Sequence, residues 1–162
     1  MDTIWIGNDH GGYEMKKQIL GYLAEKGILY HDIGCDSVDI VRYPYYAAQV
    51  AGAVSTGKAS RGILICSTGI GMSIIANKYA HVRAALCTSA YTAHMTRAHN
   101  NSNVLCLGGK TTGIFEAYSI LDAWLGTDYL GGRHDISLAL IDECERAHFT
   151  GPMWSPDMNC TH

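Results

Sequence analysis

Charged side chains are scarce in this sequence. Asp, Glu, Lys and Arg make up 17% of its 162 residues, whereas an average globular domain has about 25%. Their balance is slightly acidic, with 12 Lys and Arg against 15 Asp and Glu. Proteins that hold a nucleic-acid backbone need an excess of basic residues, so nucleic-acid binding is disfavoured as the main function. Hydrophobic residues reach 48%, which disfavours disorder.

Long apolar runs are also missing. No stretch approaches the roughly 20 apolar residues that a membrane-spanning helix needs, so we expect no membrane partner. Met1, Asp2 and Thr3 lack the basic residues that open a signal peptide, and Gly7 interrupts the apolar run that follows. We therefore expect a cytoplasmic protein.

Metal-binding and disulfide motifs are absent as well. The six cysteines are far apart, without a C-x-x-C pair, at positions Cys35, Cys66, Cys87, Cys106, Cys144 and Cys160. This spacing favours reduced thiols in the core over a disulfide framework or a zinc site. The sequence also contains no HExxH motif, no paired His at metal-binding spacing and no carboxylate cluster, so we expect no metal.

Short apolar runs that alternate with amphipathic segments predict the fold class. Five predicted strands cover residues 4–6, 28–33, 62–66, 83–87 and 103–107. Because these runs are continuously apolar, both faces of the sheet should be covered by helices, as in a parallel α/β sheet. We expect one domain over residues 1–148 and a C-terminal tail over 149–162, which holds two of the three prolines.

Apolar stripes and one proline predict the helices. Pro44 suits the first turn of a helix over Tyr45–Val54. A shorter helix is expected over Met72–Tyr79, and a last one over residues 134–148. The stripes of the first, fifth and last helices are Met15, Ile19, Tyr22 and Leu23, then Ile114, Tyr118, Leu121 and Leu125, and then Ile136, Leu140 and Cys144.

The most informative turn is Cys66-Ser67-Thr68-Gly69-Ile70-Gly71, between a predicted strand and a predicted helix. Backbone N–H groups at such a turn can converge on an anion, helped by the helix dipole. Ile74 and Val104 stand where a dinucleotide fingerprint and a Walker A loop would need glycine. Cys66 beside the helix N-terminus is a candidate thiolate base or nucleophile. The alternatives are a plain tight turn and an inert core cysteine.

Other candidate residues have equally simple alternatives. Asp9 and His10 follow the first strand, where they could contact a ligand or cap a helix. His99 ends a helix before the fifth strand, a position where histidine also complements the helix dipole. Lys110 and Arg133 are the basic residues closest to candidate ligand turns, and could instead be solvated.

Taken together, the turns resemble those of the type B ribose-5-phosphate isomerases. The residues that carry the resemblance are Gly7-Asn8-Asp9-His10, Tyr43-Pro44, residues 62–74, Ala76-Asn77-Lys78, Arg83-Ala84-Ala85, His99-Asn100 and Gly131-Gly132-Arg133-His134. The resemblance runs from about residue 3 to residue 147. It implies a Rossmann-like three-layer α/β/α sandwich with a five-stranded parallel sheet and an additional C-terminal helix. It also implies no cofactor or metal, and homodimers or homotetramers with active sites shared between subunits.

The resemblance implies interconversion of ribose 5-phosphate and ribulose 5-phosphate through a cis-enediolate. Cys66 matches the base that moves a proton between C1 and C2, and His99 matches a ring-opening residue that reaches in from the partner subunit. Thr68 and Asp9 match residues that position or relay protons. The substrate would be bound by the backbone of Ser67, Gly69, Ile70 and Gly71, by His10 and Arg133 at the phosphate, by Tyr43 and Asn100 along the sugar, and in part by Lys110.

One departure from the family pattern leaves the sugar open. Ser137 stands where ribose-5-phosphate isomerases usually place a second phosphate-binding arginine, and serine cannot copy a bidentate guanidinium. Allose 6-phosphate, galactose 6-phosphate and erythrulose 4-phosphate are therefore alternative substrates. A non-catalytic sugar-phosphate sensor and a cysteine hydrolase that uses Cys66 and His99 are alternative functions.

Overall fold

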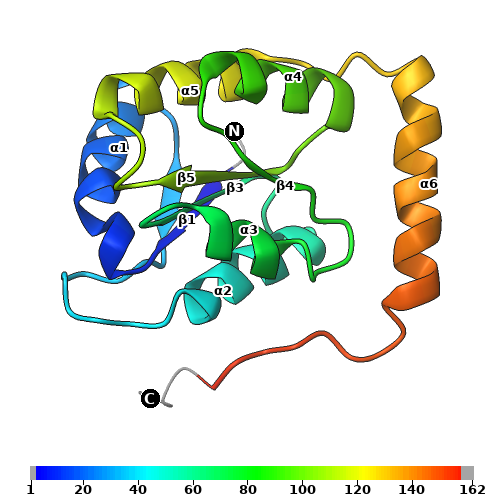
Figure 1. The fold of residues 1–162 in the computed structure, drawn as a ribbon, viewed down its shortest axis with the longest axis horizontal. Helices are drawn as coiled ribbons and strands as arrows, with labels where there is room; N and C mark the ends of the chain where they lie inside the picture. The colour runs from blue at the N-terminus through cyan, green and yellow to red at the C-terminus, as the bar shows by residue number, and fades with distance from the viewer. Residues whose placement is uncertain (1–2, 158–162) are drawn as a thin grey trace.

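A computed structural model describes residues 3–157 and shows a three-layer α/β/α arrangement (Figure 1). Its elements are β1 (Ile4–Asn8), the 3-10 helix η1 (His10–Gly12), α1 (Tyr13–Glu25), β2 (Tyr30–Asp32), α2 (Tyr43–Ser55), β3 (Gly62–Cys66), α3 (Ile70–Ala76), β4 (Ala84–Leu86), α4 (Ala90–Asn100), β5 (Val104–Gly108), α5 (Ile114–Gly126) and α6 (Arg133–His148). The five strands form one parallel sheet in the order β2-β1-β3-β5-β4. The predicted fold class is confirmed.

Two apolar layers cover the sheet because β3 and β5 are apolar on both faces. Ile63 and Ile65 point into a core shared with α1, α4 and α5, while Leu64 and Cys66 point into a core shared with α2 and α3. All five residues of β3 and all five of β5 are buried. The interior strands are therefore held by packing on both sides, which fixes the positions at which they end.

The sheet edges and short helices differ from their predicted boundaries. The strand expected over 28–33 is only β2, Tyr30–Asp32, because this edge strand has a single neighbour and its first two residues are exposed. The helix expected over Met72–Tyr79 is α3, Ile70–Ala76. It ends where the Asn77 side chain pairs with the backbone N–H and carbonyl of Ala84, at 2.9 Å each.

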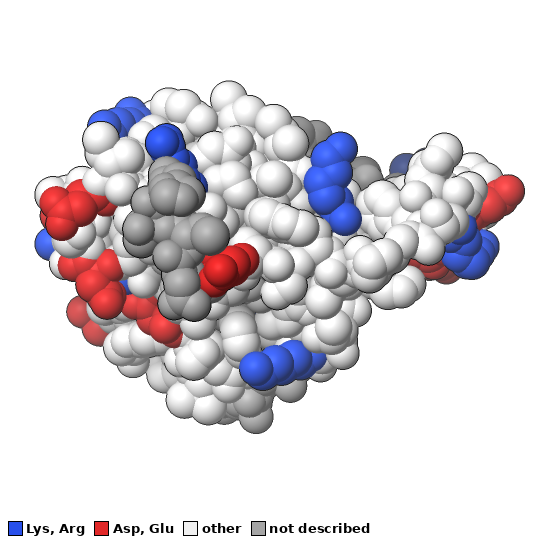
Figure 2. Space-filling view, turned by 90° about the horizontal axis from the view of Figure 1, so that it is seen from below, with Lys and Arg blue, Asp and Glu red and all other residues white. Residues whose placement is uncertain are grey.

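The last helix lies where the sequence predicts it, but it has few contacts with the rest of the chain. Figures 1 and 2 show α6 as an arm that projects from the body. The apolar stripe of this helix is solvent-exposed, with 67% of Ile136 and 60% of Leu140 accessible, and none of the α6 residues is buried. The described chain therefore provides no surface that covers this stripe.

The cysteine prediction is confirmed in part. Cys35, Cys66, Cys87 and Cys106 are buried free thiols, but Cys144 on α6, a helix with no buried residue, is exposed. Cys160 lies outside the described residues. Within residues 3–157, none of the helices is both long enough and apolar enough to cross a membrane.

The described part of the tail, residues 149–157, turns back beneath the body (Figure 1). The Tyr79 hydroxyl donates a 2.6 Å hydrogen bond to the carbonyl of Trp154. Met153 lies against α2, since a Cβ built on Gly52 would be 3.8 Å from its terminal methyl group. The tail therefore contacts the body through both its backbone and its side chains.

The buried interior of β3 makes a testable prediction about stability. We expect Ile65→Ala to lower the free energy of unfolding by about 2–5 kcal/mol, since Ile65 is fully buried and the lost methyl groups leave a cavity. Leu29→Ala, at a residue with 56% exposure, should cost within about 0.5 kcal/mol. Urea unfolding of both variants measures the difference, and equal losses would contradict the packing described here.

Candidate active site

The carboxyl ends of β1 and β3 meet at one edge of the sheet. β1 and β3 are neighbours in the sheet. The strand that follows β1 in sequence, β2, lies on one side of this pair, and the strands that follow β3, namely β4 and β5, lie on the other. Open α/β sheets bind ligands at such a switch point, outside the carboxyl ends of the strands. The two most informative turns of the sequence follow these strands: Asp9 to Gly12 after β1 and Ser67 to Gly69 after β3.

The turn after β3 depends on a left-handed glycine and on the neighbouring strand. Gly69 has φ of +76°, and a Cβ there would lie 2.6 Å from Leu86 Cδ1. The turn after β5 holds the other side, because the Gly109 N–H donates to the Cys66 carbonyl at 2.8 Å and the Lys110 N–H donates to the Ser67 carbonyl at 2.9 Å. The backbone of the turn is therefore fixed before any ligand binds.

Cys66 lies between the core and this turn. Its side chain is buried and packs in the α2–α3 core, yet its Sγ accepts a hydrogen bond from the Gly69 N–H at 3.1 Å. The sequence assigned the anion-stabilising field to a helix dipole, but α3 has only seven residues. The Gly69 amide aimed at the sulfur is the more direct source of that field.

Two other buried cysteines are poor candidates for a base. Burial raises the pKa of the Cys87 thiol to about 11 and raises the pKa of the Cys106 thiol well above its usual range. Both are therefore neutral thiols near pH 7. Cys66 combines the end of a central strand with a backbone amide donor, as a candidate base requires.

Asp9 is a helix cap, as its alternative interpretation predicted. Its Oδ1 accepts hydrogen bonds from the Gly11 N–H at 2.8 Å and the Gly12 N–H at 3.3 Å. Burial raises the pKa of the Asp9 carboxyl, although these amides and the nearby His10 and Lys110 oppose the rise. The cap fixes the carboxyl group at the carboxyl end of β1.

The remaining predicted residues of this edge surround the turn. The ring of Tyr43, the first residue of α2, lies over Gly71, where a Cβ would approach it to 2.8 Å. The Oγ1 of exposed Thr68 accepts the Ile70 N–H at 3.4 Å. The structure thus brings together at one edge the predicted residues Asp9, His10, Tyr43, Cys66, Ser67, Thr68, Gly69, Ile70, Gly71 and Lys110.

His99, Asn100 and Arg133 do not join this group within one chain. α4 starts beyond the carboxyl end of β4 and returns to the start of β5, so its last residues, His99 and Asn100, lie at the amino edge of the sheet. The His99 ring stacks on His134 with ring centroids 4.2 Å apart, which places Arg133 beside them. A single chain therefore carries two separate halves of the predicted site.

The amino-edge half is firmly anchored. Arg97 is buried, and its guanidinium donates to the Ser102 carbonyl at 2.6 Å and to Asn101 Oδ1 at 2.9 Å. Burial lowers the pKa of Arg97 to about 10, so the side chain remains charged near neutral pH. Burial and the neighbouring His99 and Arg133 also lower the pKa of His134. These contacts fix the chain around His99.

Comparison with known proteins identifies the family. A sequence model of the ribose/galactose isomerase family matches residues 4–141. The chain belongs to this family. It is 44% identical to ribose-5-phosphate isomerase B of Escherichia coli over 146 residues, which cover 90% of this chain and 98% of that protein. It is also 41% identical to D-erythrulose-4-phosphate isomerase of Pectobacterium atrosepticum over 133 residues, which cover 82% of this chain and 88% of that protein.

Solved structures give the same result. Ribose-5-phosphate isomerase B of Clostridium thermocellum superposes with a TM-score of 0.88 at 43% identity, covering 90% of this chain and 99% of that one. The Mycoplasma genitalium enzyme with bound ribulose-5-phosphate gives a TM-score of 0.85 at 38% identity, covering 89% of this chain and 96% of that one. The resemblance found in the sequence is therefore confirmed as membership of the ribose/galactose isomerase family, with its fold.

Sequence reasoning missed a buried lysine on α1. Lys16 on α1 is 2% exposed and pairs with Asp32 at 2.9 Å. Its burial could have been predicted from spacing, because Lys16 lies on the same helical face as Gly12, Ile19 and Leu23. All four residues are buried. A lysine on such a stripe needs an acidic partner, which the sequence alone did not identify.

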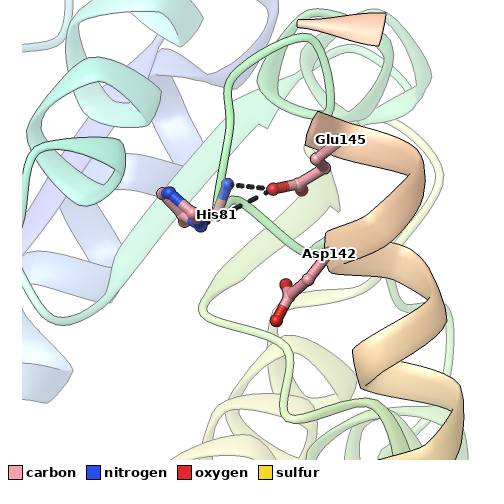
Figure 3. Close-up of side chains that lie close together, drawn as sticks. All are labelled: His81, Asp142 and Glu145. Atoms are coloured by element: carbon pink, nitrogen blue, oxygen red, sulfur yellow. Dashed lines mark hydrogen bonds and ion pairs between the residues drawn. The ribbon is translucent and has the colours of Figure 1, made fainter. Parts of the chain in front are cut away.

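A separate polar cluster links α6 to the turn after α3 (Figure 3). His81, Asp142 and Glu145 place possible metal-binding atoms within 4.8 Å of one another. Glu145 already accepts the His81 N–H at 2.7 Å and lies 3.6 Å from His81 Nδ1. We interpret the cluster as a clip between α6 and the turn after α3, because the Glu145 carboxylate is already used in these contacts.

A cavity of about 400 Å³ lies beside this clip, between α6 and the edge of the body. Its lining includes Ala84 of β4, Asn100 of α4 and Ile141 of α6. It is therefore next to the amino-edge half and away from the turn after β3. No other part of the described chain fills the cavity between α6 and the body.

The constrained glycine of the turn provides a test. We expect Gly69→Ala to lower the free energy of unfolding by about 1–3 kcal/mol, because alanine disfavours a φ of +76° and its Cβ would meet Leu86. Gly113→Ala is the matched control, with φ of −68° and open space around the glycine. Denaturant unfolding compares the two, and equal stability would contradict the constraint at Gly69.

Proposed function

We propose that the protein is a type B ribose-5-phosphate isomerase that interconverts ribose 5-phosphate and ribulose 5-phosphate through a cis-enediolate. The observation that carries the proposal is the Cys66 Sγ held 3.1 Å from the Gly69 N–H at the carboxyl end of β3. Similarity to ribose-5-phosphate isomerase B over 90% of the chain supports the same reaction. No metal or other cofactor has a role in this proposal.

In the proposed reaction, Cys66 moves a proton between C1 and C2 of the open-chain sugar. Positioned acid–base groups contribute typically about 10²–10⁴ in rate. Backbone N–H groups of residues 67–71 stabilise the enediolate oxygen, an interaction that needs fixed donors. The hydrogen bonds from the Gly109 and Lys110 amides to the carbonyls of Cys66 and Ser67 keep that backbone in place.

The other predicted residues take the roles that the family resemblance gives them. Thr68 and Asp9 position or relay protons, and Tyr43 and Asn100 line the sugar. His10 and Arg133 bind the phosphate, with Lys110 as an additional cation. His99 opens the furanose ring.

We further propose a homodimer or homotetramer in which two protomers share each site. The support is the separation of Cys66 and His99 at opposite edges of one sheet. The exposed apolar stripe of α6 supports an interface there, because such stripes usually pack against something. A second copy would bring His99 and Arg133 to Cys66.

The physiological sugar and the compartment are also proposals. Ribose 5-phosphate is the leading substrate, and erythrulose 4-phosphate is the second candidate, because Ser137 replaces an expected arginine and one relative is a D-erythrulose-4-phosphate isomerase. A cytoplasmic location fits the five described cysteines, which are all free.

The proposed base can be tested directly. We expect Cys66→Ala to lower the turnover of ribose 5-phosphate by about 10²–10⁴. Cys106→Ala is a matched control, because this fully buried thiol on β5 has no proposed role and its loss should affect stability only. The assay measures the formation of ribulose 5-phosphate from ribose 5-phosphate. Allose 6-phosphate and D-erythrulose 4-phosphate are tested as alternative substrates in separate assays of their own products. If the unaltered protein binds but turns over none of these, it is a sensor rather than an isomerase.

The shared site can be tested by complementation. Cys66→Ala and His99→Ala homodimers should both be nearly inactive, because every site lacks one of the two residues. Coexpression yields heterodimers with one intact site each, so activity should return to about a quarter of the native level if pairing is random. A coexpressed mixture no more active than the separate variants would show that each site is built from a single chain.

A further inference from the structure

His10 is held by a backbone amide from a distant segment. Its Nδ1 lies 3.3 Å from the backbone nitrogen of Val41, which is a donor only. Nδ1 must therefore be the acceptor, and the neutral ring carries its proton on Nε2. This leaves an Nε2–H donor for another partner.

The segment that carries Val41 packs on the body at its first residue, Ile33, but has little packing in its middle. Residues 33–42 connect β2 to α2 without a helix or strand. Its middle is open to solvent, with 63% of Val38 and 78% of Ile40 exposed. The position of Val41 therefore depends on contacts made elsewhere in the segment.

Cys35 provides several of those contacts. It is buried, its N–H donates to the Asn8 carbonyl at 3.2 Å, and its own carbonyl accepts from Lys16 Nζ at 2.8 Å. Its Sγ accepts from Asn8 Nδ2 at 3.2 Å and donates to the Ser37 carbonyl at 3.4 Å. Both backbone groups and the side chain of one residue thus join the segment to β1 and α1.

Two of the partners of Cys35, Lys16 and Asn8, are themselves fixed. Lys16 is buried and its charge is paired with Asp32 at 2.9 Å. Asn8 is fully buried at the end of β1, and its Nδ2 also donates to the Asp9 carbonyl at 2.9 Å. Its Oδ1 lacks a hydrogen-bond partner among the described residues, so the amide of Asn8 is held through its nitrogen alone.

We propose that Cys35 is a positioning residue: it anchors segment 33–42 so that the Val41 amide keeps His10 as an Nε2–H donor for the substrate phosphate. The inference rests on the proposed function for the identity of the ligand, but the state of the His10 ring does not depend on it. Since His10 contacts the phosphate and not the reacting carbons, Cys35 acts on substrate binding rather than on proton transfer.

The sharpest test uses two substitutions of the same residue. Serine can accept from Asn8 and donate to Ser37 as the thiol does, whereas alanine can do neither. We expect Cys35→Ala to raise the KM for ribose 5-phosphate by about tenfold with kcat unchanged, the size of effect expected when a hydrogen bond to a charged group is lost. Cys35→Ser should restore the native KM. A fall in kcat with unchanged KM would overturn the proposal.

A double-substitution cycle separates this role from general structural damage. In a His10→Ala background, Cys35→Ala should raise KM no further, because the group that Cys35 positions is gone. An equal increase in both backgrounds would overturn the proposal.

The unaltered protein supplies a readout that needs no substitution and no activity. Long-range ¹H–¹⁵N NMR spectra of the neutral His10 ring should show the Nε2–H tautomer alone. A dominant Nδ1–H tautomer would overturn the inference even if the protein is an active isomerase. If ribose 5-phosphate is not turned over, the proposed function fails while this spectrum still decides the state of His10.

Discussion

The left-handed backbone of Gly69 is the constraint on which the site depends. It allows the chain to leave β3 in a tight turn, so that the Gly69 amide points back at the sulfur of Cys66. The hydrogen bonds from the β5–α5 turn then hold the carbonyls of Cys66 and Ser67 from the other side. Because every residue of β3 and β5 is buried, this arrangement rests on the most buried part of the sheet.

The interior of the fold could be predicted from the sequence because its signals are local. The runs at 62–66 and 103–107 are continuously apolar, and the corresponding strands are β3 and β5, shifted by at most one residue. The length of β2 could not be predicted, because Ile28 and Leu29 have the same apolar character as strand residues. Only the position of β2 at the edge of the sheet limits it to Tyr30–Asp32.

The candidate site likewise has residues that the sequence identifies and residues that only the structure reveals. Asp9, His10 and Cys66 were identifiable because they lie at the ends of apolar strands or directly after them, and parallel strands bring their carboxyl ends together. Lys16, Cys35 and Val41 were not identifiable, because their roles depend on contacts between elements far apart in the sequence. The exposure of the α6 stripe was missed for a related reason: periodicity shows that a face is apolar, but not which surface covers it.

The anchoring of α6 at both ends has a mechanical consequence. The stack of His99 on His134 holds its start, while the contact of Glu145 with His81 and the bond from Tyr79 to the carbonyl of Trp154 hold its end and the chain beyond. A helix of 16 residues spans about 24 Å and resists bending when both ends are tied. The helix is therefore held rigidly, and the backbone of Arg133, its first residue, lies at a fixed distance from the body. In the proposed assembly, the distance between the phosphate site at Arg133 and the sulfur of Cys66 is therefore fixed. This distance would select sugar phosphates by their chain length.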